Sequence, residues 1–362
     1  MNFKFQGIIS LLGLLLFLNS CSKDSKYTFT HSEPEAKGYS SQKLDLLKTH
    51  LEKSGASSMM VIVDGDVVFE WGETSKKHVI HSMRKALLNS LIGIAIEQGK
   101  IDTSLTLREL EIDDIEPKLS ESEQNARIVD LLKSRSGVYH NAAGVSEGML
   151  RDMPERNSFA PGEHYYYNNW DFNTIGAILE KQTGQSIYEL FEQEIAIPLS
   201  MNDYKGEYCT IDAESENAKR PDDDDIDGFY QYENSKSQYP AYHFRMSTRD
   251  LALYGLLYMN NGNWNGKQII PKDWIDISTR PYSIYNPEYR LAYGMLWRVI
   301  VPNEDTKRNS FFHTGVGIHM LGVYPDLNMV FVHRVDTEND YDYNKADFYK
   351  MLGFLFDSKI KK

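Results

Sequence analysis

The sequence has 362 residues, 41% hydrophobic and 25% charged, a composition that is typical of globular proteins and excludes a disordered chain, a collagen or a coiled coil. Its formal net charge of −13 argues against a surface that follows phosphate groups, so nucleic acid is not an expected partner. With only two cysteines, Cys21 and Cys209, the chain cannot be a disulfide scaffold or a cysteine-based zinc module.

Residues 1–20 have the pattern of a signal peptide. Lys4 provides a short basic start, and the apolar run 7–18 is much shorter than the roughly 20 residues of a membrane-spanning helix. The Leu-Asn-Ser-Cys sequence that ends at Cys21 resembles the lipobox of bacterial lipoproteins. This resemblance implies a lipid on Cys21 and an exported protein anchored in the bacterial cell envelope, at the outer membrane or periplasm. An ordinary secretory peptide is the alternative, and in either case the polar residues 21–36 form a tether.

The mature chain begins with a helix, a hairpin and a second helix. Leucines at helical spacing predict a helix over 41–53. The β-branched and aromatic runs 58–63 and 66–71, joined by an Asp-Gly pair that favours a tight turn, predict a two-stranded hairpin. An apolar periodic segment that starts at Ser82 and ends near Gly99 predicts a buried helix.

The rest of the chain changes from a helical to a strand-like pattern. Between about 100 and 290, helical patterns alternate with polar loops, most clearly at 172–181, 187–194 and 248–260. From 291 onward the sequence predicts four strands and a closing helix, at 293–301, 310–313, 318–324, 329–335 and 343–356. This order predicts one sheet assembled from about 37–99 and 291–360, with the part 100–290 inserted as a helical subdomain.

Ser82 and Lys85 form an S-x-x-K pair at the start of the predicted buried helix. Residues three apart share a helix face, so the lysine amine would lie beside the serine hydroxyl and could take its proton. The same spacing occurs at three other serine and lysine pairs, but only Ser82 begins a buried helix directly after strand-like sequence. The structural alternative is a helix-capping serine followed by a surface lysine.

Two other patterns are weaker. Ser146 is the centre of a G-x-S-x-G match, but the polar sequence before it is not strand-like, as a nucleophile elbow requires. Asp223, Asp225 and Asp227 match the first half of a calcium-binding loop, although Asn234 stands where that loop needs a bidentate glutamate. An acidic loop exposed to solvent is the favoured interpretation, and bound calcium is the alternative.

Two further blocks lie downstream of Ser82. A Pro-Gly pair at 161–162 precedes the Tyr-Tyr-Tyr-Asn-Asn run 165–169, and His313-Thr314-Gly315 stands in strand-like sequence. Together with the S-x-x-K pair, and in this order, the blocks resemble those of the serine β-lactamase and penicillin-binding-protein family, nearest its class C and esterase-like branch. The distance from the Pro-Gly pair selects Tyr167 and Asn169 as the family's Tyr-x-Asn pair. Many esterase-like members carry histidine in place of the family's lysine, as His313 does here.

The resemblance covers nearly all of the mature chain and implies one serine hydrolase domain over 37–360. Its fold would be α/β (α+β), with an antiparallel sheet built from both chain ends, flanking helices and an inserted helical subdomain. The domain would cleave an ester or amide bond of a small-molecule or peptide substrate, with no metal or organic cofactor. Two alternatives remain on the same fold: a catalytically silent lipoprotein that binds peptidoglycan or a partner, and a true β-lactamase or D-alanyl peptidase.

The resemblance also assigns roles to individual residues. Ser82 would attack the substrate carbonyl and form an acyl-enzyme, while Lys85 and Tyr167 would move the proton, with the choice of base left open. Asn169 would hold Lys85 and the substrate in place. Backbone N–H groups of Ser82 and Val316 would stabilise the oxyanion. The motif residues beside Val316 would contribute to substrate binding, and these are His313, Thr314 and Gly315.

Overall fold

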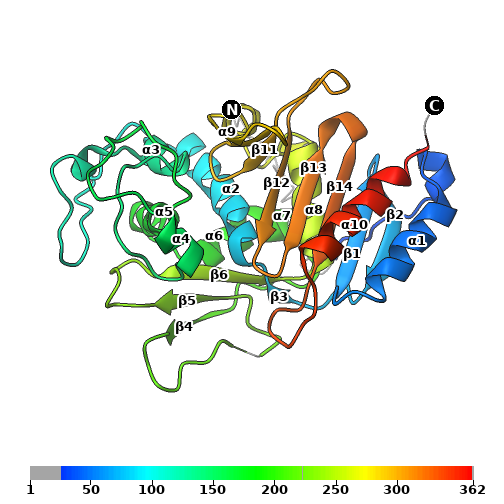
Figure 1. Cartoon of the computed structure of the whole chain (residues 1–362), viewed down its shortest axis with the longest axis horizontal. Coiled ribbons are helices and arrows are strands. Elements are labelled where there is room, and N and C mark those ends of the chain that lie inside the picture. The colour runs from blue at the N-terminus through cyan, green and yellow to red at the C-terminus, as the bar shows by residue number, and fades with distance from the viewer. Residues whose placement is uncertain (1–25, 222, 361–362) are drawn as a thin grey trace, which may run out of the picture.

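A computed structural model of the chain describes residues 26–221 and 223–360 (Figure 1). The predicted signal peptide and Cys21 lie outside the described residues. Within the described ranges, no helix combines the length and the apolar character that a membrane span requires.

The centre of the molecule is an eight-stranded antiparallel sheet with the order β2-β1-β14-β13-β12-β11-β10-β9. Its strands are β1 (Ser58–Val63), β2 (Asp66–Gly72), β9 (Ser283–Asn286), β10 (Leu291–Tyr293), β11 (Arg298–Ile300), β12 (Ser310–Gly315), β13 (His319–Tyr324) and β14 (Met329–Arg334). The N-terminal strand β1 pairs with the C-terminal strand β14 along its whole length. This pairing confirms the predicted antiparallel sheet assembled from both ends of the chain.

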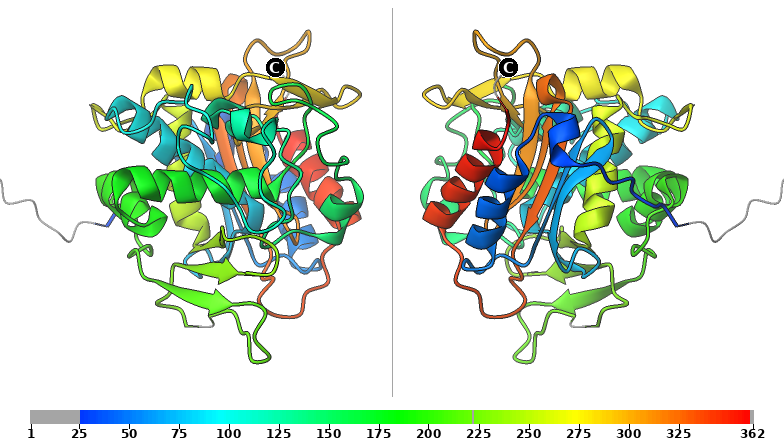
Figure 2. Two further views of the ribbon diagram at one scale, coloured as in Figure 1. Left: turned by 90° about the vertical axis from the view of Figure 1, so that its left-hand side faces the viewer. Right: turned by 90° about the vertical axis from the view of Figure 1, so that its right-hand side faces the viewer.

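Helices cover both faces of this sheet. On one face, α1 (Ser41–Leu51) and α10 (Lys345–Asp357) lie side by side, as the right-hand view of Figure 2 shows. On the other face, α8 (Thr248–Met259) packs against β13 and β14, and α2 (Arg84–Glu97) lies beyond it. Because apolar side chains from both faces of the sheet and from the helices are removed from water, this layering supplies most of the core.

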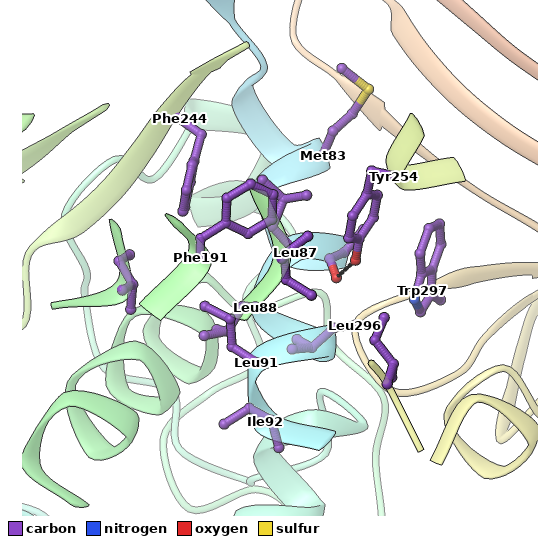
Figure 3. Packing of buried hydrophobic residues seen from close by; sticks show 14 of the residues in the cluster. Met83, Leu87, Leu88, Leu91, Ile92, Phe191, Phe244, Tyr254, Leu296 and Trp297 are labelled. Carbon is purple, nitrogen blue, oxygen red and sulfur yellow. Dashed lines mark hydrogen bonds between the residues drawn. The ribbon is translucent and has the colours of Figure 1, made fainter. Parts of the chain in front are cut away.

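Helix α2 is buried on nearly all sides, which explains why its sequence is apolar almost throughout. In Figure 3, Leu87 of α2 lies between Phe191 and Phe244 on one side and Tyr254 and Trp297 on the other. All five of these residues are almost fully buried. Each such side chain stabilises the fold by roughly 1.5–3 kcal/mol through burial, so the start of α2 is held in a rigid surrounding.

The segment between the two parts of the sheet contains the remaining helices. The α-helices are α3 (Ile128–Leu132), α4 (Glu147–Arg151), α5 (Asn169–Thr183), α6 (Ile187–Phe191), α7 (Ile197–Leu199) and α9 (Lys272–Ser278). The 3-10 helices of the described chain, some of them outside this segment, are η1 (Pro34–Lys37), η2 (His81–Met83), η3 (Glu123–Asn125) and η5 (Pro325–Leu327), and η4 (Glu192–Ala196) is a π-helix. Helix α5 packs against α2 and α3, so that its N-terminus is directed toward the start of α2.

This segment also contains strands that the sequence analysis did not predict. A second sheet has the order β3-β6-β5-β4 and consists of β3 (His78–Val79), β4 (Tyr208–Asp212), β5 (Gly228–Tyr232) and β6 (Ala241–Met246). A small hairpin consists of β7 (Asn263–Trp264) and β8 (Lys267–Gln268). Strand β3 directly precedes the turn that carries Ser82, so this second sheet helps to position the predicted nucleophile.

Candidate active site

Ser82 lies in the short turn η2, between strand β3 and helix α2. The residue before it, His81, has a left-handed backbone with φ of 49°, which turns the chain sharply out of the strand. The His81 ring is held by its Nε2 atom, 2.7 Å from Thr337 Oγ1. Ser82 is only partly buried, whereas its neighbours His81 and Met83 are buried. The sequence predicts Ser82 in the first turn of the buried helix. In the structure it lies in the 3-10 turn η2, which directly precedes α2.

Lys85 lies directly beside Ser82, with its Nζ atom 3.0 Å from Ser82 Oγ. The lysine side chain is completely buried, so the interpretation as a surface lysine is wrong. Burial lowers the pKa of Lys85 well below its ordinary value, and the neighbouring Arg84 and Arg298 lower it further. The surroundings therefore favour the neutral amine, which can accept a proton from a hydroxyl group.

Tyr167 is the tyrosine that reaches this pair. Its ring centroid lies 5.0 Å from Lys85 Nζ, and its hydroxyl is buried without a hydrogen-bond partner among the described residues. Burial raises the pKa of Tyr167, although Arg298 and Ser82 oppose the rise, so the phenol keeps its proton near neutral pH. Tyr166 points elsewhere and donates a hydrogen bond to the Met149 carbonyl at 2.6 Å. Of Tyr166 and Tyr167, only Tyr167 has its ring beside the Lys85 amine, and it is the tyrosine that the distance from the Pro-Gly pair selects.

The two asparagines after Tyr167 differ in their contacts. Asn168 caps helix α5 and donates to the Val138 carbonyl at 2.7 Å, which is a structural role. Asn169 donates its Nδ2 to the Gly144 carbonyl at 2.7 Å, while its Oδ1 is buried without a partner in the described part of the chain. The expected contact between Asn169 and Lys85 is not formed within the described residues: Nδ2 donates to Gly144, and Oδ1, the atom that could accept from the lysine amine, has no partner. Its side-chain oxygen is the atom that remains available.

His313 is fully buried on strand β12. Its Nδ1 lies 3.0 Å from the Thr314 carbonyl oxygen, which can only accept, so Nδ1 carries the hydrogen. The Nε2 atom then bears a lone pair, and it has no hydrogen-bond partner among residues 26–221 and 223–360. Burial lowers the pKa of His313 well below its ordinary value, with further lowering by the Arg298 charge. The ring is therefore held in its neutral form.

The end of strand β12 passes directly against the turn that carries Ser82. A Cβ atom on Gly315 would lie 2.6 Å from the Ile80 carbonyl oxygen and 3.1 Å from His81 Cβ, so only glycine allows this approach. Val316 follows at the end of the strand, with 62% of its side chain exposed. Thr314, Gly315 and Val316 thus lie beside the nucleophile turn, which is the arrangement that the predicted oxyanion site requires.

The second nucleophile candidate has an ordinary structural role. Ser146 caps helix α4, where its hydroxyl accepts a hydrogen bond from the Met149 N–H at 3.3 Å. No strand leads into it, so it lacks the strained elbow that would present a nucleophile.

The acidic segment agrees with its favoured interpretation at Asp223 and Asp225, which are exposed, and differs from it at Asp227. Asp227 is not exposed to solvent: it is fully buried, pairs with Lys77 Nζ at 2.7 Å and accepts a hydrogen bond from the Lys205 N–H at 2.7 Å. Asp225 pairs with Lys205 at 2.8 Å. Asp227 directly precedes β5 and Lys77 directly precedes β3, so their ion pair connects the starts of these two strands. A pattern of alternating aspartates does not reveal that one of them has a buried lysine partner.

Two arginines near Lys85 carry no role in the sequence analysis. Arg84 is buried, with its guanidinium 4.8 Å from the ring centroid of Tyr242. Arg298 on β11 has its guanidinium 5.2 Å from the ring centroid of Tyr167. Arg84 stands inside the S-x-x-K pair and could have been noticed there, whereas no sequence signal connects Arg298 to this site.

Comparisons with known proteins agree with this architecture. The model of the family described as Beta-lactamase matches residues 45–352. An uncharacterised protein of Alkalihalophilus pseudofirmus is 25% identical over an alignment 323 residues long, which covers 81% of this chain and 88% of that protein. Among solved structures, an octameric penicillin-binding protein homologue from Pyrococcus abyssi has a TM-score of 0.62 at 21% identity, with 89% of this chain and 78% of that chain covered.

Two further solved structures share the fold. A Bacillus anthracis protein provisionally named a 6-aminohexanoate-dimer hydrolase has a TM-score of 0.63 at 20% identity, covering 92% of this chain and 88% of that chain. A class C β-lactamase has a TM-score of 0.59 at 14% identity, covering 88% of this chain and 96% of that chain. At such identities these likenesses show the fold, and the assignment of chemistry depends on the residues themselves.

Proposed function

This chain belongs to the Beta-lactamase family, and from that premise we propose that it is a serine hydrolase that cleaves an ester or amide bond through an acyl-enzyme on Ser82. The observation that carries the proposal is the 3.0 Å contact between Ser82 Oγ and the buried amine of Lys85. A serine hydroxyl is a weak nucleophile until a base takes its proton, and a desolvated lysine beside other cations is such a base.

In acylation, Ser82 Oγ forms a bond to the substrate's carbonyl carbon while Lys85 takes the hydroxyl proton. The bond from that carbon to the leaving oxygen or nitrogen then breaks, and Tyr167 donates its phenolic proton to the leaving atom. Lys85 returns the proton to Tyr167. In deacylation, water attacks the acyl carbon and gives a proton to the neutral Lys85 amine. The bond from that carbon to Ser82 Oγ then breaks, and the proton passes from Lys85 to Ser82 Oγ, which releases the acid product and restores the enzyme. This order of proton transfer is supported by the low pKa of Lys85 and the high pKa of Tyr167.

The negative charge that develops on the carbonyl oxygen needs hydrogen-bond donors. We assign this role to the backbone N–H groups of Ser82 and Val316, because Gly315 allows strand β12 to approach the nucleophile turn. Asn169 would accept a hydrogen bond from the substrate through its unpartnered Oδ1, and His313 would accept one through Nε2.

A fluorophosphonate probe tests whether the protein is an enzyme or a silent binding protein. We expect the folded protein to be labelled on Ser82, identified by peptide mass spectrometry, and the label to disappear in Ser82→Ala. Ser146→Ala is the matched control, because Ser146 is an exposed capping serine, and it should label like the wild type. Folded protein without label on Ser82 would instead support the binding protein.

We expect short-chain esters to be better substrates than β-lactams. The family's lysine at position 313 would attract the carboxylate of a β-lactam, whereas His313 is neutral and offers a lone pair. The measurement is kcat/KM at pH 7 for a nitrophenyl ester and a chromogenic cephalosporin, repeated with His313→Lys, which should shift the preference toward the cephalosporin. A wild type that prefers the cephalosporin by more than about tenfold, or 1.4 kcal/mol, would make a β-lactam the better substrate assignment.

We further propose that Cys21 carries a lipid and anchors the domain to a bacterial membrane. The lipobox-like sequence before Cys21 supports this proposal. The full-length protein should then sediment with membranes, and Cys21→Ala should release it or block its processing. Mass spectrometry of the mature N-terminus decides the matter, since an unmodified first residue other than Cys21 contradicts the anchor.

A further inference from the structure

Thr337 lies in the loop between β14 and α10 and contacts both sides of the proposed oxyanion site (Figure 1). Its Oγ1 lies 2.7 Å from Nε2 of His81, the residue directly before Ser82. Its methyl group packs on Gly317, where an added Cβ would collide with Thr337 Cγ2. Gly317 directly follows Val316, whose N–H is the second proposed donor. One side chain therefore touches the residues next to both donors.

Both of these neighbouring residues have a left-handed backbone. The φ angle is 49° at His81 and 82° at Gly317. For glycine this conformation is ordinary, but for a residue with a Cβ atom it is uncommon and persists only where surrounding contacts hold it. The turn that presents Ser82 therefore needs a support outside itself, and the hydrogen bond from the His81 ring to Thr337 provides one.

The ring of His319 on β13 supports the same two residues. Its centroid lies 5.5 Å from the His81 ring centroid, and its Nε2 would be 3.3 Å from a Cβ on Gly317. The ring is itself fixed, because its Nδ1 accepts a hydrogen bond from Arg334 Nε at 3.1 Å. His81 and Gly317 thus rest on one buried ring and are joined by Thr337.

The loop that carries Thr337 is anchored to the second sheet on both sides of this residue. Asp336 Oδ1 lies 3.3 Å from His78 Nδ1 on β3. Glu338 accepts from Arg245 on β6, with Oε1 2.8 Å from Nε. Since β3 leads directly into the turn that carries Ser82, these contacts keep Thr337 at a fixed place relative to that turn.

We propose that Thr337 is a positioning residue whose hydroxyl holds the His81 turn, and with it Ser82, in alignment with the Val316 N–H. This inference deepens the proposed function and rests on it. Two oxyanion donors act together only when each lies about 2.7–3.1 Å from the developing negative charge, so a small displacement of one lowers the rate. Thr337 acts through His81 and Gly317, and not by contact with the substrate.

The test compares two variants of Thr337 that each keep one of its contacts. Thr337→Val keeps a methyl group on Gly317 but loses the hydroxyl, and a fluorophosphonate probe should label its Ser82 about tenfold more slowly than in the wild type. Thr337→Ser keeps the hydroxyl and should recover most of the rate. Because Thr337→Val loses one hydrogen bond, its melting temperature should fall by only about 2–4 °C.

Thr49→Val is the matched control for this comparison. It removes an exposed hydroxyl that donates to the Asp45 carbonyl at 2.9 Å on α1, a helix on the opposite face of the central sheet from α8. This variant should label at the wild-type rate.

The pH dependence distinguishes positioning from proton transfer. Burial lowers the pKa of His81 to about 3, so its ring stays neutral near neutral pH and its bond to Thr337 does not titrate there. Thr337→Val should therefore lower the labelling rate by the same factor between about pH 6 and pH 9. With the nitrophenyl ester, kcat should fall and KM should stay unchanged, because oxyanion donors act in the transition state.

A second pair of variants tests the methyl contact independently. Gly317→Ala places a Cβ against Thr337 Cγ2 and should slow the labelling of Ser82. Removal of that methyl group makes room for the new Cβ, so Gly317→Ala combined with Thr337→Ser should label faster than Gly317→Ala alone.

The outcomes separate the inference from the proposed function. Labelling of Thr337→Val at the wild-type rate, a displaced pH profile, or an equal loss in Thr337→Ser would overturn the inference. A double variant that labels no faster than Gly317→Ala would overturn it as well. Absence of label on Ser82 in the wild type would instead overturn the proposed function.

Discussion

Removing any one of Ser82, Lys85 and Tyr167 should nearly abolish turnover without unfolding the protein. We expect Ser82→Ala to lower kcat/KM by roughly 10⁴-fold or more, and Lys85→Ala and Tyr167→Phe by about 10²- to 10⁴-fold each. The reason is that the three side chains handle one proton in turn, so the loss of one makes the others ineffective. The contacts among them, 3.0 Å from Lys85 Nζ to Ser82 Oγ and 5.0 Å from Lys85 Nζ to the Tyr167 ring, support such a unit.

The triple variant provides the critical comparison. Residues that act as one unit are not additive, so we expect the triple variant to be little worse than the worst single variant. Steady-state kinetics with the nitrophenyl ester gives this result, with circular dichroism to verify the fold. Retained activity in Ser82→Ala together with loss in Ser146→Ala would mean that the nucleophile is misassigned.

Much of the fold could be predicted because its elements have clear local patterns. The β-branched and aromatic runs around an Asp-Gly turn predicted the β1 and β2 hairpin, whose second strand extends one residue further than predicted, and the periodic apolar segment after Ser82 predicted α2. The run 293–301 was predicted as one strand, but it contains only the last residue of β10, a tight turn and the short strand β11, because the apolar residues of the turn read as strand and Leu296 adopts a φ of 61°. An apolar turn gives no sequence signal.

The second sheet, β3-β6-β5-β4, has no local sequence pattern that predicts its strands. Strand β4 alternates between exposed and half-buried residues, and it pairs in parallel with β5, which lies across a loop of polar residues. Parallel pairing between distant segments depends on tertiary contacts rather than on local pattern. The strand character of β5 and β6 likewise follows from their pairing with each other and with β4 and β3.

The candidate site was predictable where a motif fixes a spacing. Ser82, Lys85 and Tyr167 meet because the start of α2 and the segment before α5 pack together. The place of Arg298 beside the Tyr167 ring could not be predicted, since no motif connects strand β11 to this site. The hydrogen bond from Asn169 Nδ2 to the Gly144 carbonyl could not be predicted either. The motif identifies Asn169 as a site residue, but only the tertiary structure shows which of its side-chain atoms is available to a substrate.

Gly315→Ala should disable the site by displacing backbone rather than by removing a functional group. The added Cβ would lie 2.6 Å from the Ile80 carbonyl oxygen, a backbone atom that cannot rotate away, so the end of β12 must move off the nucleophile turn. A shift of about 1 Å between Ser82 and the oxyanion donors would lower the rate by about 10²-fold.

The matched control is Gly353→Ala in helix α10, where an added Cβ meets no atom within 4 Å. Alanine is the better helix former by up to about 1 kcal/mol, so this variant should be as stable as the wild type or more so, with unchanged labelling of Ser82. Gly315→Ala should label about 100-fold more slowly while keeping its fold, because the clash is confined to one strand end. If Gly315→Ala labels at the wild-type rate, the contact between β12 and the nucleophile turn does not position the oxyanion donors, and Val316 loses its assigned role.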